Sequence, residues 1–384
     1  MTLINGDRGR DGIMYQLPAV HRGIAERLIC LHDEIKGENT LASLSRIAVA
    51  LYDDTSDMVK TFIHSSDGES PVDGASAPLA QSHSLKQLAK TGARRIINDL
   101  TPSANDGGSF SRRLYDAGYR SSYTVPIVNK GTFYGFLFFN SFEIGFFQPP
   151  VVQRLRPYAE LISLAVMREL DTVRMMQAAV KVIRSVSSAR DEETGSHLAR
   201  MARYARLIAA KMPDHYGLTD EYVEFLFQFC PLHDVGKVAV PDAILLKPGK
   251  LTEDEFTLMK GHVVKGVEII DLMMRDFGLK SMPYLDVLRN IVAYHHEALD
   301  GSGYPYGLRE SQIPIEARIA AVADVFDALT SVRPYKNAWT NEEAMHLLQK
   351  NAGTKFDPEC VDILAGSLDE IKVIQARFAE TVFD

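Results

Sequence analysis

The spacing of apolar and polar positions divides the chain into a first part that contains strands and a second part that is helical. In residues 17–148, short helical segments alternate with strand-like segments. Residues 149–184 keep a helical repeat with almost no helix breaker, and residues 185–384 show helical spacing throughout. The pattern predicts an α+β domain with an antiparallel sheet, then a long linker helix and an all-α domain. Residues 1–16, rich in Gly and Asp, are expected to be disordered.

The individual elements of the first domain follow from shorter patterns. Residues 17–34 have apolar side chains at steps of three and four and predict an amphipathic helix, and residues 41–51 are predicted as a second short helix. Residues 58–64 alternate and predict a strand. In residues 121–142, two β-rich runs flank Asn129-Lys130-Gly131, which predicts a hairpin.

The linker helix carries an apolar seam along one side. Its positions are Val152, Leu155, Ala159, Ile162, Val166, Leu170, Val173, Met176, Val180 and Ile183. A helix of about 35 residues spans about 50 Å, more than one domain's core needs. We therefore expect a homodimer through the N-terminal and linker helices, with this seam as a parallel coiled coil. The alternative is that the seam packs on the chain's own two domains.

Composition and charge narrow the class of protein. The 384 residues are 46% hydrophobic and 24% charged, enough for two cores, and the net charge of -8 argues against binding of duplex nucleic acid. An anionic substrate would need a local basic cluster. The cysteines Cys30, Cys230 and Cys360 are far apart, which favours unpaired thiols in a reducing compartment. Neither a signal peptide nor a membrane span is expected, so we expect a cytoplasmic protein.

The sequence HDVGK, residues 233–237, is the centre of the candidate chemistry. His233 and Asp234 follow an apolar helix face, where an ionisable pair is costly to bury without a partner such as a metal ion. Gly236 is expected to end the helix, and Lys237 lies about one turn beyond His233. Other segments supply further imidazoles and carboxylates: Glu193, His197, His262, His295, His296 and Asp324.

The types of these residues indicate the metals and the reaction. Glu193 and His197 are four apart and share a helix face, although alone they fit an exposed surface pair better. Five imidazoles and three carboxylates fit two or three divalent ions, and a set without thiolate suits Fe, Mn, Zn or Ni. Such clusters serve phosphoester hydrolysis, because they bind phosphate oxygens and lower the pKa of a bound water to about 7.

Residues of this second part resemble the HD-GYP phosphodiesterases of bacteria. The segments that carry the resemblance, over about residues 180–370, are HDVGK, VPDAILLKPGKLT, HHEALDGSGYPYGL, IPIEARIAAVADVFDALTSVRPYK and GTKFDP. The family has an all-helical fold, and its members hydrolyse cyclic dinucleotides, mostly cyclic di-GMP. The resemblance implies that the imidazoles, Asp234 and Asp324 are metal ligands. It places Gly303, Tyr304 and Pro305 in the loop that names the family.

Further roles follow from the same resemblance. Glu193 is typical of the three-metal branch, so iron is expected, with manganese as the alternative and zinc or nickel after it. Lys237, Arg333 and Lys336 are expected to contact substrate phosphates, and Arg333 suits a forked contact. Tyr304 is expected either near a substrate base or in a structural role. Asp327, one turn after Asp324, is counted as a substrate contact, and it could instead orient a metal ligand.

The first domain resembles a GAF domain in its order of elements. The hairpin segment that begins at Pro126, with Gly131 and Gly135, resembles the family's pattern. GAF domains usually sense small ligands or pair with another subunit. The histidines of this part, His21, His32, His64 and His83, are better explained as surface or core residues than as ligands.

The function predicted is a GAF-regulated phosphodiesterase that opens cyclic di-GMP to pGpG and then to GMP. A metal-bridging hydroxide would attack phosphorus, with Asp234 as the bridging ligand and Lys237 beside the phosphate. Ala298-Leu299 departs from the family's usual bulkier or charged residues, which leaves 3'3'-cyclic GMP-AMP open as the substrate. Two competing hypotheses are a non-catalytic cyclic dinucleotide receptor and a different HD phosphohydrolase.

Overall fold

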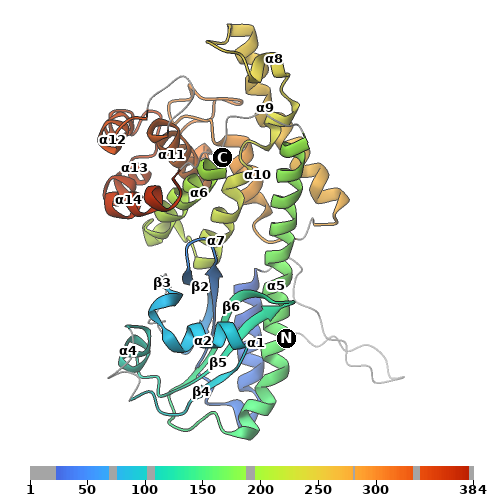
Figure 1. Ribbon diagram of the computed structural model, residues 1–384, viewed down its shortest axis with the longest axis vertical. Coiled ribbons are helices and arrows are strands. Elements are labelled where there is room, and N and C mark those ends of the chain that lie inside the picture. The colour runs from blue at the N-terminus through green and yellow to red at the C-terminus, as the bar shows by residue number, and fades with distance from the viewer. Residues whose placement is uncertain are drawn as a thin grey trace, which may run out of the picture.

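A computed structural model describes residues 23–68, 76–101, 109–186, 195–279, 282–331 and 338–379. It contains a sheet with helices in the first part of the chain and helices with short turns in the second (Figure 1). The long helix α5, Pro149–Val186, runs beside both parts. The predicted fold class is confirmed. Residues 1–22, which include the segment predicted to be disordered and His21, lie outside the described residues.

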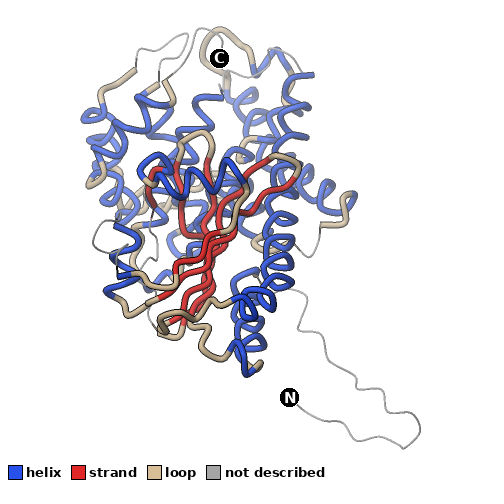
Figure 2. Tube along the Cα trace, turned by 60° about the horizontal axis from the view of Figure 1, so that its bottom comes forward, coloured by secondary structure: helices blue, strands red, loops and turns tan. Residues whose placement is uncertain are grey.

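The sheet has six strands in the order β3-β2-β1-β6-β5-β4, with every pair of neighbours antiparallel. Figure 2 shows these strands in red, with helices packed around them. The strands are β1 Arg46–Asp53, β2 Met58–Ser66, β3 Ser76–Pro78, β4 Arg95–Ile97, β5 Ser121–Asn129 and β6 Thr132–Ser141. The predicted hairpin is β5–β6. Its turn residues Lys130 and Gly131 both have positive φ, 49° and 84°, as a two-residue turn that matches the strand twist requires.

The helix predicted at residues 41–51 is wrong, because most of this segment is strand β1. Only a 3₁₀ turn, η1 Asn39–Leu41, touches its start. Strand β1 lies between β2 and β6 in the middle of the sheet, and Ile47, Ala48 and Val49 are all buried. A strand covered on both faces gives a continuous apolar run, which periodicity alone does not separate from a buried helix.

Helices α1 Ile24–Lys36 and α5 lie side by side against the sheet (Figure 1). The Tyr158 hydroxyl on α5 donates to Glu38 at 2.7 Å, just after α1. The remaining helical elements of this part are η2 Leu79–Gln81, α2 His83–Thr91 and α4 Ser109–Asp116. His32 is buried, with its ring nitrogens 2.8 Å from Ser65 Oγ and 3.0 Å from the Leu44 carbonyl, so it is a core residue as expected.

The apolar seam of α5 packs within its own chain. Its members Leu155, Ala159, Ile162, Val166 and Val173 are each at most 3% exposed in the single chain. The expectation that this seam pairs with a second copy is therefore wrong, and packing on the chain's own domains is what the structure shows. The homodimer itself, expected through the N-terminal and linker helices, stays a prediction.

The helical part holds no strand among its described residues, only isolated bridges. Its helices are α6 Gly195–Ala210, α7 Asp220–Phe229, α8 Asp242–Leu245, α9 Glu253–Asp276, α10 Leu285–Tyr294, α11 Ile315–Thr330, α12 Asn341–Lys350, α13 Pro358–Ala365 and α14 Leu368–Arg377. Its 3₁₀ turns are η3 Asp214–Tyr216, η4 Cys230–Leu232, η5 Val235–Ala239 and η6 Glu310–Gln312. Thr252 and Thr340 cap α9 and α12 through capping boxes. None of the described helices is both long and apolar enough to cross a membrane.

The two parts of the chain are packed against each other through one continuous core. The Phe62 ring of β2 lies 6.4 Å from the Phe225 ring of α7. The Glu221 carboxylate of α7 accepts hydrogen bonds from the backbone N–H groups of Ile24, at 2.7 Å, and Ala25, at 3.3 Å. The second part thus satisfies donors at the first turn of α1, which fixes how the two parts sit together.

Candidate metal centre

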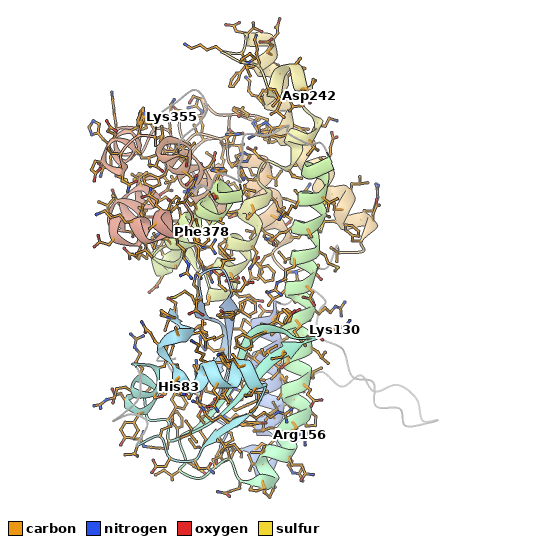
Figure 3. The ribbon with its side chains drawn as sticks, viewed as in Figure 1. His83, Lys130, Arg156, Asp242, Lys355 and Phe378 are labelled. Carbon is orange, nitrogen blue, oxygen red and sulfur yellow. The ribbon has the colours of Figure 1, made fainter. Side chains whose placement is uncertain are left out.

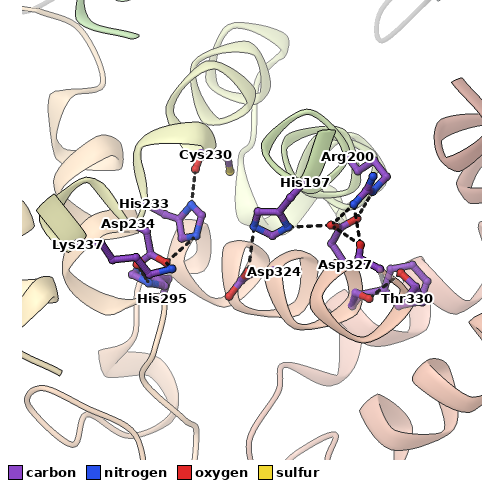
Figure 4. Close-up of polar contacts among 12 residues, drawn as sticks. His197, Arg200, Cys230, His233, Asp234, Lys237, His295, Asp324, Asp327 and Thr330 are labelled. Atoms are coloured by element: carbon purple, nitrogen blue, oxygen red, sulfur yellow. Dashed lines mark hydrogen bonds and ion pairs between the residues drawn. The ribbon is translucent and has the colours of Figure 1, made fainter. Parts of the chain in front are cut away.

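Side chains from five separate segments converge inside the helical part. Figure 4 shows His197, Asp234, His295 and Asp324 among them. Their imidazole nitrogens and carboxylate oxygens form two groups, and within each group the ligand atoms lie within 4.8 Å of one another. One group is Asp234, His262, His295 and His296, and the other is His197, His233 and Asp324. Seven of the eight predicted ligands are therefore brought together, while Glu193 lies outside the described residues.

Asp234 lies between the two groups. Its Oδ1 is 2.9 Å from Nε2 of His262 and 3.3 Å from Nε2 of His295. Its Oδ2 is 3.4 Å from Nε2 of His233 and 2.7 Å from Nζ of Lys237. Because each oxygen faces a different group, this carboxylate is placed to bridge two ions.

The backbone orients three of the imidazoles. Their Nδ1 atoms lie at hydrogen-bond distance from carbonyl oxygens, in the pairs His233–Cys230 at 2.9 Å, His262–Met259 at 2.7 Å and His295–Ile291 at 2.9 Å. A carbonyl only accepts, so each Nδ1 carries the proton and each Nε2 directs its lone pair into the centre.

The inner atoms of this cluster lack hydrogen bonds. Nε2 of His262, Nε2 of His295 and Oδ1 of Asp234 are buried without a hydrogen-bond partner among the described residues. Buried polar atoms are nearly always satisfied, so several exceptions at one point require an explanation. Imidazole and carboxylate lone pairs that face one another fit divalent metal ions.

Electrostatics keeps the ligands in their metal-binding forms. Burial alone would raise the pKa of Asp234, but the Lys237 ammonium holds it well below its usual range. Burial and the neighbouring His295 lower the pKa of His296 well below its usual value. A carboxylate and a neutral imidazole are the protonation states that bind cations.

Asp327 orients the His197 ring through Nδ1, the ring nitrogen that faces away from the candidate centre. Nδ1 of His197 is 2.8 Å from Asp327 Oδ2, and its Nε2 is 3.6 Å from Asp324 Oδ1 (Figure 4). Arg200 donates to both oxygens of Asp327, at 2.7 and 2.9 Å, and the Ser331 hydroxyl donates at 3.0 Å. Asp327 is fully buried. A substrate contact by Asp327 is therefore wrong, and orienting a ligand is the role that fits this geometry.

The sequence interpretation missed Arg200. Its signal was present, because Arg200 lies three residues after His197 and one helical turn places the two side by side. A buried arginine needs a carboxylate partner, and Asp327 is the one that it finds.

The loop of Gly303, Tyr304 and Pro305 packs over His296. The Tyr304 ring lies 4.6 Å from the His296 ring, and the Tyr304 N–H donates to the His296 carbonyl at 3.1 Å. A side chain at Gly303 would meet the Ala298 nitrogen at 2.4 Å. The loop is thus a tightly held wall of the centre, and a contact between Tyr304 and a substrate base stays a prediction.

The Glu297 carboxylate fixes the residues that follow this loop. It accepts from the backbone N–H groups of Tyr306, at 2.7 Å, and Leu308, at 2.9 Å. Glu297 is buried, so these two donors also satisfy a carboxylate that would otherwise be costly to place there.

The predicted phosphate contacts are placed only in part. Lys237 is partly exposed, and its ammonium faces Asp234 at one side of the centre. Arg333 and Lys336 lie outside the described residues.

Gly236 allows two backbones to cross at the centre. It remains inside the turn η5, so the expectation that it ends a helix is wrong. A Cβ at this position would lie 1.9 Å from the His262 carbonyl oxygen and 2.4 Å from the Gly266 nitrogen, both backbone atoms of α9. Only glycine therefore brings Asp234 and His262 this close together.

We expect Gly236→Ala to destabilise the protein by about 3 kcal/mol, because the backbone of η5 or α9 must move. Denaturant unfolding measures this change. Gly261→Ala in α9 is the matched control, since its Cβ would meet nothing within 4 Å, and it should be neutral or slightly stabilising. Equal stability of Gly236→Ala and the unmodified protein would contradict the crossing.

A family model described as HD domain matches residues 187–360. This part of the chain is an HD domain. The match contains both groups of candidate ligands, and an HD domain implies binding of divalent metal. The matched segment begins before α6 and ends within α13.

Relatives of the chain carry names that concern cyclic dinucleotides. The cyclic di-GMP phosphodiesterase response regulator RpfG of Xanthomonas campestris pv. campestris is 43% identical over 212 residues, which are 55% of this chain and 51% of that protein. The 3'3'-cGAMP-specific phosphodiesterase 2 of Vibrio cholerae is 44% identical over 192 residues, 50% of this chain and 35% of that protein. The chain thus spans about half the length, or less, of these curated relatives.

Structural neighbours of the chain include GAF domains. The GAF domain of a two-component sensor histidine kinase from Bacillus halodurans has a TM-score of 0.32 and 16% identity, and it covers 37% of this chain and 93% of that one.

Proposed function

We propose that this protein is a metal-dependent phosphodiesterase of cyclic dinucleotides. The observation that carries the proposal is the pair of ligand groups joined by Asp234 inside the HD domain. The relatives named for cyclic di-GMP and for 3'3'-cGAMP support the substrate class. We take cyclic di-GMP as the first substrate, opened to pGpG and then to GMP, and 3'3'-cyclic GMP-AMP as the alternative.

The proposed metal ligands are the seven converging residues, with Asp234 shared between two ions. Divalent ions at this position supply positive charge for phosphate oxygens and an activated water for attack. The mixed imidazole and carboxylate set favours iron, with manganese next and zinc or nickel after them. Glu193 is proposed as the ligand of a third ion.

The chain's own groups hold the reacting phosphate and keep the metal ligands in the protonation states that bind cations. Lys237 keeps Asp234 ionised and lies at the edge of the centre, where its ammonium can hold a phosphate oxygen. Arg333 and Lys336 are proposed as further phosphate contacts. Asp327 and Arg200 fix the ring of His197 so that Nε2 faces the centre.

We also propose the division of the chain that the sequence predicts. Residues 17–148 act as a GAF-like sensor, residues 149–184 as the linker helix and residues 185–384 as the phosphodiesterase domain of a cytoplasmic homodimer. The close packing of Phe62 against Phe225, and of Glu221 against the start of α1, supports regulation through contact between the domains.

The test is hydrolysis of cyclic di-GMP and 3'3'-cyclic GMP-AMP side by side, with the metal content measured on the same sample. We expect turnover of at least one of them by metal-loaded protein, and loss of turnover when a chelator removes the metal. If the loaded protein binds both dinucleotides without hydrolysing either, a receptor function replaces the proposal.

A further inference from the structure

A cavity of about 770 Å³ lies between the sheet and the HD domain. Its walls come from the β1–β2 hairpin, α5, α6 and α7, which meet at the junction in the middle of Figure 1. The volume is within the range of small-molecule sites, about 300–1,000 Å³. None of the seven described candidate ligands lines it, so it is separate from the two ligand groups described above.

Positive charge is concentrated in this cavity. Its cationic side chains are Lys60, Arg174, Lys181, Arg203 and Arg206, and its acidic ones are Asp53, Asp54 and Glu224. Cations are in excess here although the whole chain has a net charge of -8. A local excess of positive charge in a cavity attracts anions.

Three of these cations gather around one aromatic ring. The Lys60 ammonium lies 5.9 Å, the Arg203 guanidinium 5.4 Å and the Arg206 guanidinium 4.5 Å from the centre of the Phe227 ring. Arg203 also lies 3.9 Å from the ring centre of Phe378, which follows α14 on the helical side of the junction in Figure 3. Like charges this close repel one another, so the arrangement needs negative charge nearby.

The acidic residues of the cavity supply only part of this negative charge. Arg203 pairs with Asp53 at 3.0 Å, and Arg206 pairs with Glu224. The second terminal nitrogen of Arg206, Nη1, is buried without a hydrogen bond to any described residue. Burial, followed by the charge of Arg206, lowers the pKa of Lys60 to about 7.

We propose that this cavity binds a small organic anion, whose acid group contacts Lys60 and Arg206 and whose apolar portion packs among the hydrophobic walls. Those walls include Leu51, Leu170, Val180 and Leu232, together with the rings of Tyr52 and Phe227. An acid group would supply the missing acceptor for Arg206 Nη1 and a counter-charge for Lys60.

Such a ligand would touch both domains at once. Leu198, Ala199 and Ala202 of α6 face the cavity, while His197 and Arg200 of the same helix lie at the metal centre. A ligand in the cavity therefore packs on the helix that positions His197. This site is additional to the proposed phosphodiesterase activity and lies at the junction of the domains rather than within the sheet domain.

The test is calorimetric titration of the whole 384-residue, metal-loaded protein with 1-naphthalenesulfonate and with 1-naphthoate, in the absence of any dinucleotide. We expect at least one of these aromatic anions to bind with one site per chain. The neutral analogue 1-naphthalenemethanol should bind about tenfold more weakly or worse, because it lacks the charge. If neither anion gives saturable binding, the proposal fails, whatever the outcome for hydrolysis.

Variants at Lys60 separate binding from folding. Lys60→Gln should weaken binding of the anion about tenfold. Lys86→Gln, which removes an exposed lysine of α2 outside the cavity, should leave the affinity unchanged.

The folded state lowers the pKa of Lys60 from 10.5 to about 7, so its protonation opposes folding increasingly below pH 10.5 and fully below pH 7. Lys60→Met should therefore keep or raise the Tm at pH 6 without ligand. A lower Tm, or unchanged affinity in Lys60→Gln, would mean that Lys60 is structural and would overturn its role in the anion site.

Discussion

Asp234→Ala is expected to abolish metal loading and dinucleotide hydrolysis together. Asp234 provides the oxygens that face both ligand groups, so its loss would take a carboxylate oxygen away from each group. It also leaves the Lys237 ammonium without the carboxylate at 2.7 Å, which adds repulsion toward a bound cation. Residues that only orient a ligand change metal affinity by about 10- to 100-fold, and the loss of a shared ligand should exceed that range.

The measurement is metal content by elemental analysis and hydrolysis rate on the same preparation. Asp271→Ala is the matched control, because Asp271 pairs with Arg289 at 2.7 Å on an exposed part of the same domain. An exposed ion pair contributes about 0.2–1 kcal/mol, so this variant should keep its metal and its activity. Full turnover by Asp234→Ala would refute the bridging role, and loss of metal without loss of activity would refute the metal-dependent reaction.

The local elements of the fold were predictable because their signals lie within a few residues. The turn at Lys130-Gly131 and the capping boxes of Thr252 and Thr340 each need only a short segment. Strand β1 was mistaken for a helix because side chains on both of its faces are buried, which removes the alternation that marks a strand. The α5 seam was assigned to a second copy because spacing shows that a face is apolar, and not what covers it.

The candidate site, like the fold, could be predicted from the sequence only in part. The residue types and the family resemblance indicated which imidazoles and carboxylates belong together. They assigned Asp324 as a ligand, but they counted Asp327, one turn later on α11, as a substrate contact. That role is wrong because Arg200 and His197 hold the Asp327 carboxylate in the interior. The cavity around Lys60 had no sequence signal, since it joins β2, α5, α6 and α7, and each cation alone is typical of a surface residue.

Asp327→Asn is expected to weaken the ion held by His197 while sparing the ion held by His262 and His295. An amide keeps the size of the carboxylate but not its charge, and one of its two acceptor atoms becomes a donor. It cannot accept at once from His197 Nδ1 and from both Arg200 contacts. Metal affinity in the His197 group should fall about 10- to 100-fold. Removing one partner of the buried Arg200 pair should also cost about 3–5 kcal/mol of stability.

Titration of metal-free protein with metal, followed by unfolding of the loaded form, separates these effects. Ser331→Ala is the control, because it removes one donor at 3.0 Å from Asp327 and leaves the carboxylate in place. It should cost only about 1 kcal/mol and keep both ions. If Asp327→Asn lost both ions equally, the cause would be general unfolding. Selective loss of one ion would show that Asp327 acts through the ring of His197, since Asp327 is fully buried and belongs to neither ligand group.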